Sequence, residues 1–289
     1  MMLKKLTIIL ALAGAGVSAR AQELYVQTEP ASNMPANSIG LRLTNKFYPM
    51  DHASYTGYRL QPEVMLGISK KLMVHASGYF SNVMENRFKA EGAGLYAKYR
   101  FLSVDDMHSH FRMAAFAKGS IINNPYAPPM GPDHDHTAGA FNNQDLDLDG
   151  MTSGVSAGVI ATQLVHKLAV SGSLAYDRYM NNTQHNLPYV SRSALNYTLS
   201  AGYLLLPRKY KSYKQTNLNL YVELLGKSNL DQYRSGYYVD VAPAVQLIIN
   251  SNSRIDLSYR TQLFGDMARM MDQSFLVRYE YNLYNIFKK

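Results

Sequence analysis

Apolar and polar side chains alternate along most of the chain with a period of two residues. Between positions 58 and 69, for example, Leu60 and Val64 fall on one face, and Arg59 and Glu63 fall on the other. Successive side chains of a β-strand point to opposite faces. The pattern therefore predicts strands with one apolar face and one charged face.

The alternation recurs in segments of about ten residues, the length that a tilted strand needs to cross the hydrocarbon layer of a membrane. It predicts twelve strands, at 36–45, 57–69, 72–81, 91–102, 110–121, 151–164, 167–177, 192–206, 216–226, 236–249, 253–264 and 273–284. We predict an all-β fold, a transmembrane antiparallel up-and-down β-barrel of about 12 strands. The alternative is a soluble all-β domain, which also has alternating strands and polar turns.

The lengths of the predicted connections separate into two groups. Those after odd-numbered strands are long, and the longest is 122–150, whereas most of those after even-numbered strands are short, such as 70–71 and 165–166. Bacterial outer-membrane barrels have long extracellular loops and short periplasmic turns. The grouping predicts that both chain termini face the periplasm.

The first residues predict a secretory signal peptide. Lys4 and Lys5 precede an apolar run over 6–17, and Ala-Arg-Ala at 19–21 has the small-x-small form of a cleavage site. The apolar run is shorter than the ~20 residues of a spanning helix. We expect cleavage after residue 21, leaving 22–289 as a single barrel domain in the outer membrane of a Gram-negative bacterium.

Composition excludes several function classes. The chain has no Cys, so a disulfide framework, a thiolate metal site and a catalytic cysteine are impossible. Loss of Lys4, Lys5 and Arg20 takes the formal net charge of +8 down by three to +5, and no basic block with interleaved aromatic residues indicates nucleic-acid binding. The 23 Tyr residues, with no Trp, suit the aromatic girdles that barrels place at the membrane–water interface.

Three stretches carry a resemblance to known proteins. The segments 66–75, 78–82 and 91–101 resemble the paired transmembrane hairpins of uncharacterised bacterial outer-membrane β-barrel proteins of the transporter- and porin-like group. The resemblance implies contact with outer-membrane lipid, insertion by the barrel-assembly machinery and a small-molecule solute, and it names no particular solute. The chain departs from the group at its end, where Lys288-Lys289 replaces the usual terminal aromatic residue.

With the apolar face turned to lipid, the charged face lines the lumen. The candidate solute-pathway residues are Arg59, Glu63, His75, Lys98, Arg100, Arg112, Glu223, Arg260, Arg278 and Glu280, and the same face includes Lys118, Asp177, Arg192, Asp240, Arg254 and Asp256. Without His75, nine basic residues face six acidic ones. Such a lining favours anions, which predicts a pore or transporter for small solutes, anionic ones included. The alternative is a structural barrel without conduction, in which these charges pair across a closed interior.

The longest predicted loop contains a candidate metal site. Asp133, His134, Asp135 and His136 offer imidazole and carboxylate ligands that suit divalent zinc, copper or nickel. This predicts a metal-capturing surface loop as a further alternative and implies no other cofactor. A solvated acidic loop explains the same residues, and the aspartates within 145–149 fit the polar rim of the sixth strand.

A lipid-modifying enzyme of the outer membrane is the remaining alternative. His75 and Ser77 share the predicted lumen face, and a nucleophilic serine needs a histidine within hydrogen-bond reach. Strand neighbours two residues apart need not form such a bond, and no Gly-x-Ser-x-Gly motif is present. We therefore predict no catalytic residues and no enzymatic activity.

Overall fold

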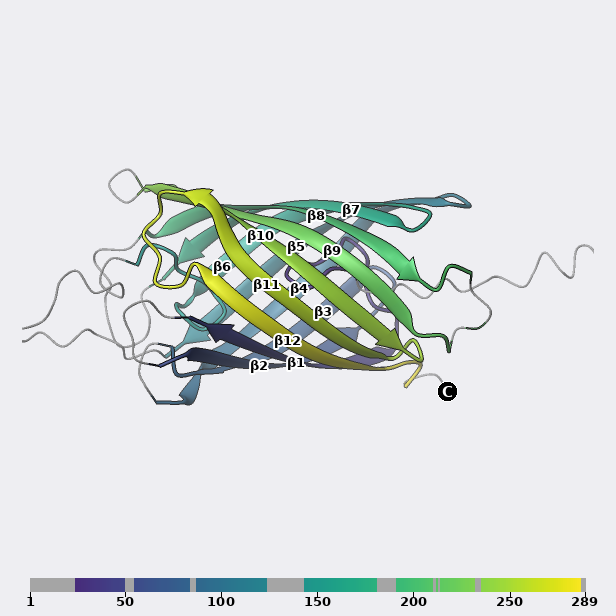
Figure 1. The fold of residues 1–289 in the computed structure, drawn as a ribbon, viewed down its shortest axis with the longest axis horizontal. Coiled ribbons are helices and arrows are strands. Elements are labelled where there is room, and N and C mark those ends of the chain that lie inside the picture. Colours follow the sequence, from purple (N-terminus) through teal and green to yellow (C-terminus); the bar gives the residue numbers. More distant parts are fainter. Residues whose placement is uncertain are drawn as a thin grey trace, which may run out of the picture.

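The strands of the protein form one closed sheet. The computed structural model describes residues 24–49, 55–83, 87–123, 143–180, 191–209, 212, 214–231 and 235–286. Within these ranges there are twelve strands, and each pairs antiparallel with its neighbours in the chain. The last strand pairs with the first, so the sheet closes into a barrel of tilted strands (Figure 1). The predicted fold class is confirmed.

The twelve strands are β1 (Ser38–Tyr48), β2 (Gly57–Gly67), β3 (Leu72–Ser81), β4 (Lys89–Asp105), β5 (Ser109–Ile122), β6 (Gly154–Val165), β7 (Leu168–Tyr179), β8 (Ser193–Leu206), β9 (Asn217–Asn229), β10 (Gly236–Ile249), β11 (Ser253–Gly265) and β12 (Gln273–Leu283). The predicted strand limits agree with these to within three residues. Among the described residues, no helix is long and apolar enough to cross a membrane.

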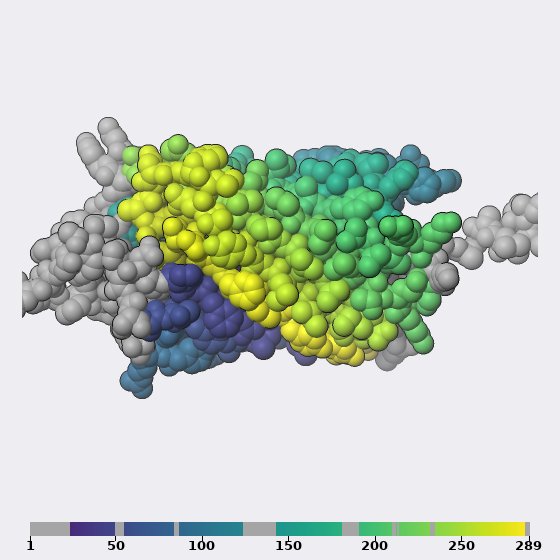
Figure 2. All heavy atoms as spheres, viewed as in Figure 1, coloured from purple at the N-terminus to yellow at the C-terminus, as the bar shows by residue number. Residues whose placement is uncertain are grey.

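The first strand is paired along both of its edges. Arg42 of β1 lies opposite Glu280 of β12 on one side and opposite Glu63 of β2 on the other. In Figure 2 the yellow atoms of β12 lie directly against the purple atoms of β1, and the wall is continuous on this face. Closure removes the unpaired strand edges that an open sheet would expose.

The two faces of the sheet have opposite chemistry. Large apolar side chains such as Leu41, Leu95 and Leu257 are exposed on the outward face, whereas Lys98 and Glu223 on the inward face are fully buried. A soluble protein places its charges outside and its apolar side chains inside. The barrel has the reverse arrangement, which suits an outer surface in contact with lipid and an interior in contact with polar groups.

Connections at the two ends of the barrel differ in length, as predicted. Those after even-numbered strands are 68–71, 106–108, 166–167, 207–216 and 250–252, and those after odd-numbered strands are 49–56, 82–88, 123–153, 180–192, 230–235 and 266–272. We call the two ends the turn end and the loop end. With the exception of 207–216, the connections at the turn end are the shorter ones, and β1 begins and β12 ends there.

Candidate functional site

Residues 24–37, which we call the N-terminal segment, lie inside the barrel and are held there by Glu223 of β9. The backbone N–H groups of Val26 and Gln27 each donate to Glu223 Oε1 at 2.8 Å, and the N–H of Thr28 donates to Oε2 at 2.9 Å. The Thr28 hydroxyl donates to the same Oε2 at 2.7 Å. Hydrogen bonds to a charged acceptor are stronger than neutral ones, so one wall carboxylate fixes three consecutive residues of the segment.

Glu29 binds the segment to strands β1 and β4. It accepts hydrogen bonds from Arg42 at 3.1 Å and from Lys98 at 3.2 Å, and Lys98 also donates to the Pro30 carbonyl at 2.7 Å. Burial favours the protonated form of Glu29, but the positive charges of Lys98 and Arg42 outweigh it and hold the Glu29 pKa well below its usual range. The segment therefore contributes a negative charge that the wall neutralises.

Apolar contacts hold the two ends of the segment. The Tyr25 ring lies edge-on to the Tyr221 ring, with 5.4 Å between centroids. Met34 is buried with Met65 and Met73. In Figure 1 the purple trace of the segment is visible inside the barrel, behind the front strands.

Residues 143–153, which we call the loop segment, enter the lumen from the loop end. Lys227 of β9 donates to Asp145 at 2.6 Å, and Arg269 donates to it at 3.1 Å. Burial favours the protonated form of Asp145, but the charges of Lys227 and Arg269 lower its pKa to about 2. Lys227 donates to the Leu146 carbonyl as well, at 2.6 Å.

The next two aspartates of the loop segment repeat this arrangement. Arg59 of β2 lies 3.0 Å from Asp147, and Lys118 of β5 lies 2.6 Å from Asp149. Although burial opposes it, Lys118 holds the Asp149 pKa well below its usual range. The predicted position of these aspartates on the rim of a strand is wrong, because pairing with basic wall residues compensates their burial inside the barrel.

Apolar residues and one turn complete the loop segment. Leu146 and Leu148 are buried against Tyr179. Gly150 has a φ of +122°, and a Cβ at this position would lie 2.6 Å from Glu91 Oε2. Only glycine fits this left-handed turn without strain.

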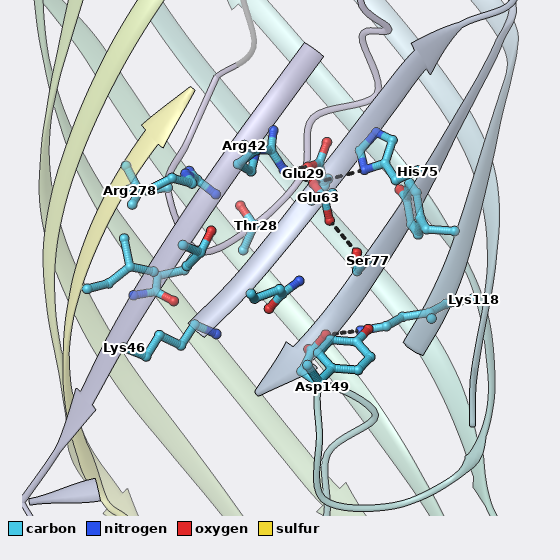
Figure 3. A pocket seen from close by; sticks show the side chains of 18 of the residues that line it. Thr28, Glu29, Arg42, Lys46, Glu63, His75, Ser77, Lys118, Asp149 and Arg278 are labelled. Atoms are coloured by element: carbon cyan, nitrogen blue, oxygen red, sulfur yellow. Dashed lines mark hydrogen bonds and ion pairs between the residues drawn. The ribbon is translucent and has the colours of Figure 1, made fainter. Parts of the chain in front are cut away.

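Two adjoining cavities, of about 180 Å³ and about 330 Å³, remain beside the two segments. Both are lined by residues 27–29 of the N-terminal segment, by Asp149 of the loop segment, and by Lys46 and Lys118 of the wall. Figure 3 shows the smaller cavity with its polar side chains pointing inward. The lumen is therefore a polar interior that two segments of the chain divide.

The ten predicted solute-pathway residues all lie on the inward face. They are Arg59 and Glu63 of β2, His75 of β3, Lys98 and Arg100 of β4, Arg112 of β5, Glu223 of β9, Arg260 of β11, and Arg278 and Glu280 of β12. Most are buried and bonded to neighbours rather than free. Their part in a solute pathway stays a prediction.

Several of these residues form one charge network in the wall. Arg42 lies 2.8 Å from Glu280 and 2.9 Å from Glu63, in addition to its contact with Glu29. The network continues through Arg254, Asp256 and Arg278. The charges of neighbouring strands are thus largely compensated, as the structural alternative requires.

Near the loop end, Arg260 lies 2.6 Å from Asp240, which Arg269 also contacts at 2.8 Å. Towards the turn end, Arg112 donates to Ser32 of the N-terminal segment at 2.9 Å. Arg260 therefore lies beside Arg269, which binds the loop segment. Arg112 lies beside the N-terminal segment.

Two arginines of the predicted lumen differ from the rest. Arg100 shares the inward face of β4 with Lys98 and is half-buried, and no ion pair joins it to another described residue. Arg192 is exposed just before β8 begins, with its N–H bonded to Asp231, so its predicted lumen position is wrong. It lies outside the strand, where the alternation of faces no longer applies.

His75 and Ser77 share a partner instead of contacting each other. His75 Nδ1 lies 3.4 Å from Glu63 Oε1, and the Ser77 hydroxyl donates to Glu63 Oε2 at 2.8 Å. An activated serine would be bonded to the histidine, so this arrangement does not favour a nucleophilic Ser77. The expectation that the protein is not an enzyme stays a prediction.

The candidate metal site at Asp133, His134, Asp135 and His136 lies outside the described residues. Within the described ranges, no group of three or more His, Asp or Glu side chains could hold a metal ion. The predicted metal loop, like the signal peptide, stays a prediction.

Several lumen residues were missed from the sequence, above all Arg42 and Lys46 of β1. They alternate with Leu41, Leu43 and Phe47, which is the same pattern that identified Arg59 and Glu63. This signal was available. Glu29 offered none, because the N-terminal segment has no strand periodicity.

Comparisons with known proteins support the fold. No protein family model and no curated protein matches the chain. An outer-membrane channel from Pseudomonas putida F1 superimposes with a TM-score of 0.58 at 10% sequence identity, over 90% of this chain and 100% of the channel. The NanC porin superimposes with a TM-score of 0.50 at 10% identity, over 84% of this chain and 100% of the porin. The chain has the fold of bacterial outer-membrane channels. The resemblance found in the sequence is confirmed at the level of the fold.

Proposed function

We propose that the protein is an outer-membrane channel for small solutes whose lumen its own N-terminal segment closes at rest. One observation carries this proposal: residues 24–37 occupy the central lumen, held there by hydrogen bonds to Glu223 and by the contacts of Glu29 with Arg42 and Lys98. This segment enters the barrel wall only at β1. It can therefore leave the lumen without breaking any strand pairing. In a purely structural barrel, side chains of the wall strands would fill the lumen and could not move out of it.

We infer that the preferred solutes are anions. Lys46 and Arg100 have no ion pair with another described residue, while the lumen carboxylates of Glu63, Glu223 and Asp240 all accept hydrogen bonds. Lys46 lines both lumen cavities, whereas the Glu223 carboxylate is enclosed by hydrogen-bond donors of the N-terminal segment. Positive groups at close quarters favour the entry of anions into a pore.

We place the protein in the bacterial outer membrane with both ends of the barrel domain on the periplasmic side. The apolar outward face supports the membrane position, and the short connections at the turn end support the orientation. A chain that enters the lumen from the turn end would then close the channel from the periplasmic side.

Planar-bilayer recordings test the proposal. The refolded barrel should conduct poorly, and a variant lacking residues 24–34 should conduct several-fold better and select anions in a potassium chloride gradient. A variant in which a Gly-Ser repeat of equal length replaces 24–34 is the matched control, and it should conduct like the deletion. No conduction by any of the three correctly folded proteins would contradict the proposal.

A further inference from the structure

Three polar side chains on two neighbouring strands line the smaller lumen cavity. Thr44 and Lys46 of β1 and Gln61 of β2 line it, and Thr44 lies directly opposite Gln61 in the strand register. None of these three side chains makes a hydrogen bond or an ion pair with another described residue. They form one contiguous group on the inward face, which we call the β1–β2 triad.

The rest of the cavity wall contrasts with the triad. Lys118 is bonded to Asp149, and Ser77 to Glu63. In Figure 3 dashed lines mark these contacts, and the Lys46 side chain reaches into the cavity with no dashed line at its nitrogen. Lys46 and Gln61 are only partly buried, so their polar groups are open to the cavity. An ammonium, a carboxamide and a hydroxyl directed into one cavity therefore indicate a place for a polar ligand.

Resting on the proposed function, we propose that the β1–β2 triad is a binding site for a small monocarboxylate on its way through the lumen. The Lys46 ammonium is the counter-ion for the carboxylate. The Gln61 carboxamide can donate and accept, and the Thr44 hydroxyl can do both. These two neighbours suit a hydroxyl or carbonyl group next to the carboxylate, as in a 2-hydroxy acid.

Two properties of the cavity limit the ligand. A protein cavity of ~150 Å³ holds benzene, so about 180 Å³ takes a solute of similar size. Glu29, Glu63 and Asp149 line the same cavity as Lys46. A second negative charge on the ligand would be repelled by them, so a singly charged carboxylate fits better than a divalent phosphate.

Calorimetric titration of the refolded full-length barrel with sodium lactate tests the site. We expect Lys46→Met to weaken lactate binding about tenfold or more, equivalent to ~1.4 kcal/mol, and Lys46→Arg to retain most of it. Lys71→Met, which removes an exposed lysine from the 68–71 turn, is the matched control and should bind like the unaltered protein. Glycerol, which is uncharged and of similar size, should bind far more weakly than lactate.

Three outcomes would overturn the inference: no lactate binding by the unaltered protein, equal binding by Lys46→Met, or tighter binding of inorganic phosphate than of lactate. Each is separable from failure of the channel itself. A barrel that conducts but does not bind lactate refutes only the site. A barrel that binds lactate through Lys46 but conducts in no variant refutes only the channel.

Discussion

The two segments that occupy the lumen are held in different ways. Hydrogen bonds from three consecutive residues of the N-terminal segment converge on the single carboxylate of Glu223. The loop segment is held through four ion pairs, two of Asp145 and one each of Asp147 and Asp149. It is also attached to the barrel at both of its ends, by β5 and β6, whereas the N-terminal segment joins the barrel wall only at β1.

This difference separates a movable part from a fixed one. Loss of the Glu223 carboxylate removes four hydrogen bonds from the N-terminal segment, which keeps the contacts of Glu29 with Arg42 and Lys98 but is joined to a strand of the barrel only at β1. The loop segment keeps three ion pairs when one is lost. We therefore expect the first segment to govern opening and the second to set the width of the loop end.

The largest effect should follow from Glu223→Ala. The substitution removes the acceptor of Val26, Gln27 and Thr28, so conductance should rise several-fold, towards that of the variant lacking residues 24–34. Single-channel recording measures this. Asp177→Ala is the matched control, because Asp177 is also a buried lumen carboxylate but is bonded to Tyr179 and Asn196. Equal conductance of the two variants would contradict the view that the N-terminal segment is the movable one and that Glu223 holds it.

Lys227→Met should affect stability more than conductance. It leaves Asp145 with Arg269 as its remaining partner, so the cost should be up to about 3 kcal/mol, the lower end of the cost of an unpaired buried charge. Urea unfolding should show this loss, and Lys214→Met, at an exposed position in the 207–216 connection, should not. Because the loop segment keeps both attachments, conductance should change less than in Glu223→Ala. A larger conductance change would mean that the loop segment is the gate.

Acid should release the loop segment only at very low pH. The Asp145 pKa is lowered from 3.8 to about 2 in the folded protein. A carboxylate with a lowered pKa stabilises the fold above its unfolded pKa, and this contribution is lost as pH falls towards the folded value. Conductance and protease resistance of the 143–153 region should stay constant from pH 7 to about 4 and change between about 4 and 2. A transition near pH 6 would contradict these ion pairs.

The smallest effect should come from Gly150→Ala in the loop segment. A side chain at positive φ costs of order 1–3 kcal/mol, and the new Cβ would also press on Glu91. Gly119→Ala is the control, because the nearest atom to a Cβ there is 4.0 Å away. Urea unfolding that gave the same stability for both variants would show that the turn is not constrained.

The barrel could be predicted from the sequence because its signal is local. Leu60 and Val64 alternate with Arg59 and Glu63 within one strand, and the solvent on each side of the wall dictates this pattern. The lumen contents depend on distant contacts instead. Glu223 lies 195 to 197 residues from the backbone groups that it binds. Nothing in the local sequence of 24–37 indicates that partner.

The loop segment shows how a local pattern can mislead. Its alternating Asp and Leu residues at 145–149 mimic the edge of a strand, and the sequence alone favours the polar rim of the sixth strand. Their alternation instead directs aspartates to Lys227, Arg59 and Lys118, and leucines to Tyr179. A loop that enters the lumen can also alternate with a period of two, because one of its sides contacts basic wall residues and the other contacts Tyr179.

A reversible cross-link between the N-terminal segment and the wall tests the central claim most directly. The natural chain has no Cys, and the Thr28 and Ser200 hydroxyl oxygens are 2.9 Å apart. In the Thr28→Cys/Ser200→Cys variant, oxidation should abolish channel openings and a reducing agent should restore them, while Thr28→Cys alone should not respond. The same open probability in the oxidised and reduced double variant, with the cross-link verified, would contradict gating by this segment.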